Sequence, residues 1–270
     1  MNRDTTVGLL GLGLVGRAIA ARLAAAGFEV LGYDRSLEAM RAFEGKATAR
    51  ALQAPRIVLA VFDTSEVEQV VEAGAASLYV DCTTGDPRRI EALAARLAAK
   101  EIGYVEAPLS GSSEAIRRGE ASMFVGGDAS GCEDLLAAIS VRRVHLGAAG
   151  MAARAKLATN LVLGLDRAAL AEGMAFAESL GIGRRQFLSL YRESPAASAA
   201  TFAKGEKMAS GDFAPASRIR QHLKDVNLMR ELSRVRLPLT EVHERLLAQA
   251  VAAGDGDLDN AAIIRRWENT

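Results

Sequence analysis

The sequence predicts an α/β protein in which a doubly wound parallel sheet comes first and an all-helical region follows. Up to about residue 146, short runs of β-prone residues alternate with helical segments. The strand candidates are continuously apolar, which is typical of parallel sheets covered by helices on both faces. From about residue 150 the strand pattern disappears, and apolar residues recur at helical spacing.

The first half should contain at least four strands and two long helices. The strands are expected at 6–10, 29–34, 57–62 and 77–81, with helices at 14–26 and 87–100. Pro87 suits the first turn of the later helix, because a proline there removes no intrahelical hydrogen bond. This alternation of strand and helix predicts the doubly wound arrangement.

The second half should be helical throughout. Apolar residues keep helical spacing from 151 to 180, and glycine-rich turns separate the segments that follow. The later helices are expected at 184–191, 196–209, 217–235, 239–253 and 258–267. We therefore predict two domains, residues 1–149 and residues 150–270, of which the second begins with a long connecting helix.

Composition and charge argue against several classes of protein. The 270 residues include 33 basic and 33 acidic side chains, and this balance argues against a nucleic-acid or anionic-membrane partner. No apolar run reaches the length of about 18 residues that a membrane span needs. Met1–Leu10 reaches a glycine turn too soon for a signal peptide. Cys82 and Cys132 are expected as buried, reduced thiols. We expect a cytoplasmic protein.

A glycine-rich turn directly after the first strand is the first chemical signal. It fits G-x-G-x-x-G and opens a predicted helix. In this pattern one glycine makes a tight turn, the next lets the backbone approach a pyrophosphate, and the third allows close packing of helix and strand. The candidate cofactor-binding residues of this turn are Gly11, Leu12, Gly13, Leu14, Val15 and Gly16. The context predicts a Rossmann-type dinucleotide site, and a glycine turn without a ligand is the alternative.

The residues after the second strand bear on the choice between NAD and NADP. Asp34 lies 23 residues after Gly11, where a carboxylate can accept hydrogen bonds from ribose hydroxyls and repel a 2′-phosphate. Arg35 and Ser36 could instead bind that phosphate through charge-assisted hydrogen bonds. The sequence favours NAD over NADP and leaves dual use open.

Several ordered motifs carry a resemblance to a known family. The segments are GLLGLGLVG at 8–16, DCTTGDP at 81–87, APLSGS at 107–112, GAAGMAARAKLATN at 147–160 and LKDV at 223–226. Together they resemble the motifs of the β-hydroxyacid dehydrogenases, which include 3-hydroxyisobutyrate dehydrogenase, tartronate semialdehyde reductase and, more distantly, 6-phosphogluconate dehydrogenase. The resemblance covers nearly the whole chain.

Lys156 and Asn160 are the candidate catalytic residues. They are four residues apart on a predicted helix and therefore project from the same face. In oxidation, neutral Lys156 would take the hydroxyl proton while hydride leaves for the nicotinamide, and in reduction its ammonium form would protonate the alkoxide. Asn160 would orient the substrate or the lysine. The alternative is a solvated lysine, and Ala152 and Thr159 depart from the family's pattern.

The remaining candidates come from the loop at 110–112 and from the family match. Ser110 and Gly111 are expected to bind the substrate carboxylate, unless they form an ordinary turn. Ser112 stands where the family has a second glycine and could reshape the pocket. The resemblance implies that Thr84 lies near the nicotinamide. It also implies that Phe62, which stands where the family often has a proline, lies near the adenosine half of the cofactor, with simple lining of the cleft as the alternative. It also implies that Lys224 reaches the cofactor or the substrate carboxylate, with a surface charge pair as the alternative.

The histidines predict no metal site. His145, His222 and His243 have no metal-ligand spacing with acidic or cysteine neighbours. His145 is expected to end a strand and His243 to lie among helix surface charges, while His222 could enter the cleft.

The sequence thus predicts an NAD(P)-dependent oxidoreductase without metal, in which Lys156 is the general acid/base. It would interconvert a small 3-hydroxy carboxylic acid and its aldehyde or keto acid, and 3-hydroxyisobutyrate, glycerate and threonate remain open as substrates. The alternatives are an imine reductase, although related imine reductases usually replace the lysine, and a non-catalytic NAD(P)-binding regulatory or scaffold protein. The resemblance also implies a homodimer or homotetramer.

Overall fold

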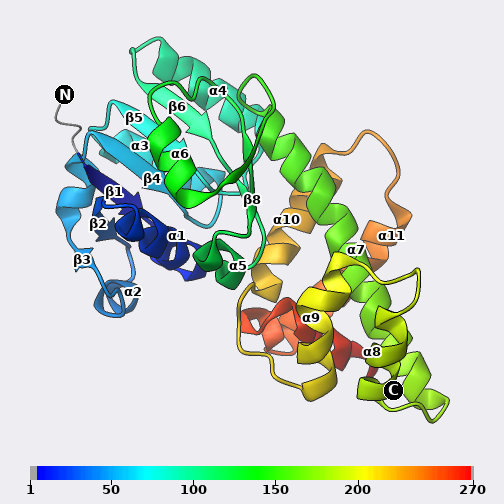
Figure 1. Ribbon diagram of the computed structural model, residues 1–270. Helices are drawn as coiled ribbons and strands as arrows, with labels where there is room; N and C mark the ends of the chain where they lie inside the picture. The colour runs from blue at the N-terminus through cyan, green and yellow to red at the C-terminus, as the bar shows by residue number, and fades with distance from the viewer. Residues whose placement is uncertain (1–4, 269–270) are drawn as a thin grey trace. The chain divides into compact units, whose positions relative to one another are not determined.

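The computed structural model describes residues 5–268. The chain divides into two compact units, and the division falls after Lys156, inside the long helix α7 (Met151–Ser179). The first unit contains a parallel sheet with helices around it, and the second is helical (Figure 1). The predicted fold class is confirmed. The domain boundary predicted after residue 149 lies just before α7.

The first unit is built on a six-stranded parallel sheet. In spatial order the strands are β3 (Lys46–Ala47), β2 (Glu29–Tyr33), β1 (Thr6–Leu10), β4 (Arg56–Leu59), β5 (Leu78–Asp81) and β6 (Gly103–Glu106). β1 pairs with both β2 and β4, so the strand order reverses at β1. Open parallel sheets bind ligands outside the carboxyl ends of their strands at such a switch point. The glycine turn directly follows β1 and is therefore at this position.

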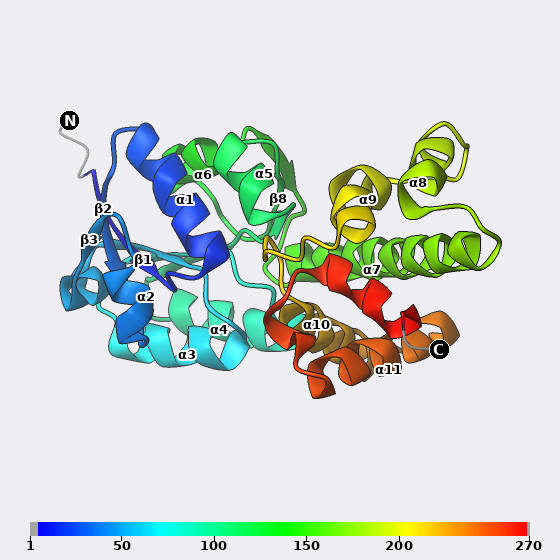
Figure 2. The ribbon, with the colours of Figure 1, turned by 90° about the horizontal axis from the view of Figure 1, so that it is seen from below.

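Helices cover both faces of this sheet (Figure 2). On one face lie α1 (Leu14–Ala25), α5 (Ser113–Arg118) and α6 (Glu133–Ile139), and on the other lie α3 (Thr64–Ala73) and α4 (Pro87–Ala98). Because successive side chains of a strand point to opposite faces of the sheet, neighbouring residues are buried in different hydrophobic clusters. Leu9 belongs to one buried cluster and Leu10 to the other. This two-sided burial explains why the strands are continuously apolar.

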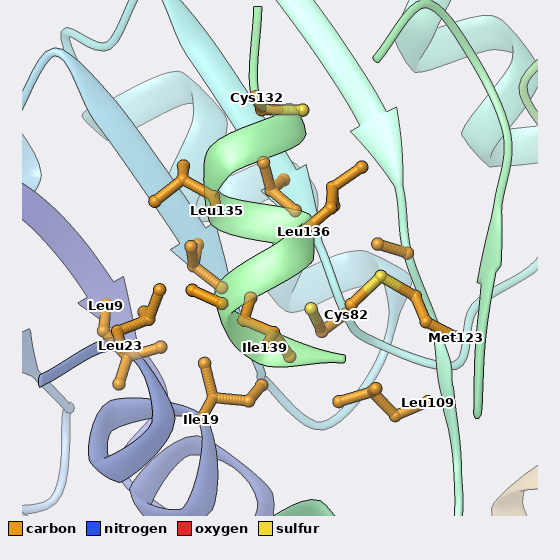
Figure 3. Close-up of a cluster of buried hydrophobic side chains, with 14 of the residues drawn as sticks. Leu9, Ile19, Leu23, Cys82, Leu109, Met123, Cys132, Leu135, Leu136 and Ile139 are labelled. Carbon is orange, nitrogen blue, oxygen red and sulfur yellow. The ribbon is translucent and has the colours of Figure 1, made fainter. Parts of the chain in front are cut away.

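The core on the α6 side includes both cysteines (Figure 3). Leu135 and Ile139 of α6 pack there with Leu9 of β1. Cys82 and Cys132 are buried free thiols, as predicted. Burial raises the pKa of both thiols, so both stay protonated at neutral pH.

No bounds were predicted for several short elements of this unit. They include α2 (Leu37–Arg41), the 3-10 helix η1 (Ala49–Gln53) and a second sheet of β7 (Leu109–Ser110), β8 (Ser122–Val125) and β9 (Arg142–His145). β9 ends at His145, as expected for that histidine. Strands of two to four residues are too short to show a period, and their pairing is decided by tertiary contacts.

In its described residues, 157–268, the second unit contains the rest of α7 and four further α-helices. They are α8 (Arg184–Arg192), α9 (Ala199–Ser210), α10 (Ile219–Leu232) and α11 (Pro238–Ala252), followed by the 3-10 helices η2 (Asp255–Asp257) and η3 (Asn260–Trp267). The last helix, predicted at 258–267, corresponds to the 3-10 helix η3. The residue before η3, Asp259, is buried and caps it. The Asp259 carboxylate caps η3 through Ala261 N–H and also holds Lys204 Nζ at 2.7 and 2.8 Å. Among residues 5–268, no helix is long and apolar enough to cross a membrane.

Candidate functional site

Two glycines of the turn after β1 are fixed by the chain's own packing. A Cβ on Gly11 would lie 2.3 Å from Ala60 O, and Gly11 has φ of +93°. A Cβ on Gly16 would lie 1.8 Å from Gly11 O. Both positions exclude a side chain for steric reasons within the protein, as the tight turn and the close helix–strand contact require.

Gly13 has no such steric reason. It is exposed, its φ is −71°, and a Cβ there would meet no protein atom within 4 Å. Gly13 is also the N-cap of α1 and provides no side-chain cap, so the first-turn N–H groups can bind an anion. The open space at Gly13 fits the close approach of a dinucleotide pyrophosphate.

We predict that Gly13→Ala weakens NADH binding at least about tenfold, because the added methyl group occupies the space of the pyrophosphate. Gly183 is the matched control. It is the N-cap of α8, has φ of −63°, and is likewise free of protein atoms within 4 Å. Gly183→Ala should change the free energy of unfolding by about as much as Gly13→Ala does, and it should leave the NADH affinity measured by fluorescence titration unchanged. Equal NADH affinities of the two variants would contradict the assignment.

Asp34 is joined directly to the glycine turn. Its Oδ2 accepts a hydrogen bond from Leu12 N at 2.8 Å, and its Oδ1 accepts one from Ser36 N at 2.8 Å. Each carboxylate oxygen has a second lone pair, so Asp34 keeps the capacity to accept ribose hydroxyls. The Ser36 hydroxyl caps α2 by accepting from Ala39 N at 3.2 Å. The sequence did not predict this capping role.

Arg35 and Phe62 are brought together by a residue that the sequence analysis missed. Glu66 of α3 forms an ion pair with the Arg35 guanidinium, and its Oε2 accepts a hydrogen bond from Phe62 N at 2.9 Å. Arg35 Nη1 also donates to Gln69 Oε1 at 3.2 Å. The Phe62 side chain is 38% exposed. Arg35 is thus directed toward α3.

Thr84 follows β5 in a turn that a buried carboxylate organises. Asp81, 1% exposed, accepts hydrogen bonds from Thr83 N at 2.8 Å and from the Tyr104 hydroxyl at 2.6 Å. Thr83 Oγ1 accepts from Val61 N at 3.2 Å and so ties this turn to the end of β4. Thr84 itself is half-buried. This turn and the glycine turn therefore both lie at the carboxyl ends of the strands of the parallel sheet.

Lys156 lies in the second turn of α7 and is only 6% exposed. The start of α7 is held by Glu106 at the end of β6, which is 1% exposed and accepts hydrogen bonds from Ala152 N at 2.8 Å and Ala153 N at 3.1 Å. Burial and the charge of Asp81 raise the pKa of Glu106 to about 7, against the opposing effect of these N–H bonds. The sequence did not indicate this role of Glu106.

Two residues of the predicted substrate loop, Gly111 and Ser112, have roles in the packing and capping of the protein itself. Ser110 ends β7 and is half-buried. A Cβ on Gly111 would lie 2.9 Å from Ala121 Cβ, so packing already requires a glycine there. Ser112 is the N-cap of α5, and its Oγ accepts from Ala115 N at 3.2 Å. The serine in place of the family's glycine therefore starts a helix.

In the second unit, Asp225 brings two predicted residues together. Asn160 Nδ2 donates to Asp225 Oδ2 at 3.2 Å, and Lys224 Nζ lies 2.9 Å from Asp225 Oδ1. Asp225 is 4% exposed and joins α7 to α10 through its bond to Asn160.

The prediction that His243 lies among surface charges is wrong. His243 is 3% exposed, and its Nε2 lies 3.0 Å from Nε2 of the equally buried His222. Gly164 of α7 makes room for the pair, since a Cβ there would lie 2.4 Å from His222 Nε2. Burial lowers the pKa of His243 to about 4, so it stays neutral at physiological pH. Within the described part of the chain, no three His, Cys, Asp or Glu residues are grouped as metal ligands.

Comparison with known proteins matches both halves of the chain. A family model for the NAD-binding domain of 6-phosphogluconate dehydrogenase matches residues 6–147. A second model, described as NAD-binding of NADP-dependent 3-hydroxyisobutyrate dehydrogenase, matches residues 150–267. The two matched ranges include the glycine turn, Lys156 and the LKDV segment at 223–226.

Individual relatives are similar over nearly their full length. An uncharacterized oxidoreductase of Synechocystis sp. is 29% identical, over 97% of each chain. The 2-(hydroxymethyl)glutarate dehydrogenase of Eubacterium barkeri is 27% identical over 99% of this chain and 96% of that protein. The structure of 3-hydroxyisobutyrate dehydrogenase from Salmonella typhimurium shares the fold, with a TM-score of 0.87 and 24% identity, over 97% of this chain and 99% of that one.

Proposed function

Because this chain belongs to the 3-hydroxyisobutyrate dehydrogenase-like family of NAD(P)-dependent β-hydroxyacid oxidoreductases, we propose that it interconverts a small 3-hydroxy carboxylic acid and its aldehyde or keto acid. The observation that carries this proposal is the burial of Lys156, in the same compact unit as the glycine turn. Lysine is among the residue types least often buried, so a buried lysine at the position of the family's motif is consistent with a task at the site. The substrate named for the Eubacterium barkeri relative also has a hydroxyl on the carbon β to a carboxylate, which supports this substrate class.

The proposed chemistry assigns one task to each side chain. When bound, the nicotinamide accepts or supplies the hydride. Lys156 Nζ takes the hydroxyl proton in oxidation and returns it to the alkoxide oxygen in reduction. Asn160, held by Asp225, orients the substrate without titrating. The Ser110 hydroxyl and the Gly111 N–H bind the substrate carboxylate.

We favour NAD over NADP as the cofactor. Asp34 is fixed beside the glycine turn through Leu12 N, at the end of β2 where the adenosine ribose binds in this fold. A 2′-phosphate there would meet a carboxylate of the same charge. Thr84 is assigned to the nicotinamide end and Lys224 to the cofactor or the substrate carboxylate, on the strength of the family motifs.

We also propose that the chain forms a homodimer or homotetramer. The second unit exposes large apolar side chains on several helices. Val162 and Phe176 of α7 are 57% and 64% exposed, and Phe202 of α9 is 63% exposed. Exposed apolar surface of this kind supports association with a second copy.

The proposal is tested by titrating the protein with NADH and NADPH and following nicotinamide fluorescence. On the same sample, a panel of 3-hydroxyisobutyrate, glycerate, threonate and 2-(hydroxymethyl)glutarate is then followed at the nicotinamide absorbance. We expect tight binding and turnover of one or two of these acids. Binding without turnover would overturn the dehydrogenase assignment, in favour of an imine substrate or a non-catalytic role. Failure to bind either cofactor would overturn the whole proposal.

A further inference from the structure

The ion pair between Arg35 and Glu66 joins the residue after Asp34 to helix α3. Glu66 is also held by the backbone, because its other carboxylate oxygen accepts the Phe62 N–H at 2.9 Å. The Glu66 side chain is 27% exposed, whereas that of Arg35 is 66% exposed. The position of Glu66 is therefore set by the backbone after β4, and the long Arg35 side chain is drawn toward it.

This pairing changes what Arg35 offers to a ligand. An arginine beside the ribose normally accommodates a 2′-phosphate with its planar fork of N–H donors. Here part of that fork is bound to the Glu66 carboxylate, and Nη1 donates to Gln69. Asp34, Arg35 and Glu66 together also carry a net charge of −1, so a 2′-phosphate would meet an excess of negative charge.

We propose that Glu66 is a specificity-determining residue that disfavours NADP by holding the guanidinium of Arg35, the residue after Asp34, and by adding a second carboxylate there. This inference rests on the proposed function, because it requires the glycine turn to bind a nicotinamide dinucleotide. It resolves the conflict between Asp34, which favours NAD, and Arg35, which alone would favour NADP. Removing the Glu66 charge makes Arg35 more available to a phosphate.

The effect should appear in binding and leave stability nearly unchanged. An exposed ion pair contributes little to folding, because solvent screens it. A 2′-phosphate carries up to two negative charges, so removing one nearby carboxylate and freeing one guanidinium both act in the same direction. We expect Glu66→Gln to tighten NADPH binding about tenfold and to leave the dissociation constant of NADH within about twofold. The amide oxygen of the substituted side chain would still accept the Phe62 N–H.

Glu68→Gln is the matched control. Glu68 lies on the same helix and is also paired with an arginine, Arg89, which comes from α4. The experiment compares NADH and NADPH dissociation constants by fluorescence titration for the native protein and the two variants. A higher NADPH-to-NADH affinity ratio in Glu66→Gln, but not in Glu68→Gln, supports the proposal. In an Arg35→Ala background the gain for NADPH should shrink, and it should also shrink in high salt.

The outcomes separate this inference from the proposed function. If the native protein binds NADH and both variants keep the native cofactor ratio, the role of Glu66 is overturned while the dehydrogenase proposal stands. If Glu66→Gln weakens both cofactors equally, Glu66 only supports the Phe62 backbone, and the specificity role is again overturned. If the native protein binds neither cofactor, the proposed function fails first.

Discussion

Lys156→Ala should lower kcat by about 10²- to 10⁴-fold, the usual contribution of a positioned proton donor or acceptor, and leave the NADH dissociation constant within about twofold. Lys156 is 6% exposed and lies in the first unit, in the second turn of α7. The variant removes the only group that we assign to proton transfer. Steady-state rates with the acid identified in the panel, together with NADH titration, measure the two quantities.

Two further variants separate proton transfer from charge and from general loss of a lysine. Lys156→Arg keeps a positive charge but cannot release its proton at neutral pH, so its kcat should also be low. Lys100→Ala removes an exposed lysine just after α4 and should change neither quantity. Unchanged turnover with weaker NADH binding in Lys156→Ala would show that Lys156 binds the cofactor.

The parts of the fold that the sequence predicted are those with a local signal. Strands β1, β2, β4 and β5 were predicted because they are continuously apolar, and α1 because it opens at the glycine turn. Helix α3 was missed although its start is readable. Asp63 caps it by accepting from Glu66 N at 3.0 Å, which gives the Asp-x-x-Glu pattern of a helix N-terminus.

His243 shows how sequence neighbours mislead. Glu241, Glu244 and Arg245 suggest a surface position, but the helical period groups His243 with other residues. Its face of α11 carries Thr240, Leu247 and Ala250, all buried. The period of 3.6 residues would have identified the buried face, whereas charge counting did not.

The candidate site divides in the same way. Gly13, Asp34 and Lys156 stand in patterns that a reader of the sequence can find. The two glutamates that hold neighbouring residues in place are remote in sequence. Glu66 pairs with Arg35 across 31 positions, and Glu106 accepts a hydrogen bond from Ala152 N across 46. The sequence around each glutamate does not indicate its partner, because the strand order of the sheet determines which remote segments lie side by side. The roles assigned to all these residues stay predictions until the variants are measured.

Glu106→Ala should lower the free energy of unfolding by about 3–5 kcal/mol, because it leaves two buried N–H groups at the start of α7 without their acceptor and opens a cavity. Glu91→Ala is the matched control, since Glu91 also reaches the first turn of α7, through an exposed ion pair with Arg154. That pair should be worth no more than about 1 kcal/mol. Urea unfolding of both variants measures the difference, and equal losses would contradict the role of Glu106.

Glu106→Gln adds a pH test of the same contact. The pKa of Glu106 is raised in the folded protein to about 7 from 4.5, so the protonated form is favoured by folding. The stability that the protonated carboxyl contributes is fully present below pH 4.5 and is lost as pH rises through 7. The native protein should therefore lose about 3 kcal/mol of unfolding free energy relative to Glu106→Gln between pH 4.5 and 8. Parallel profiles would show that the N–H donors at the start of α7 outweigh burial and keep Glu106 ionised throughout this range.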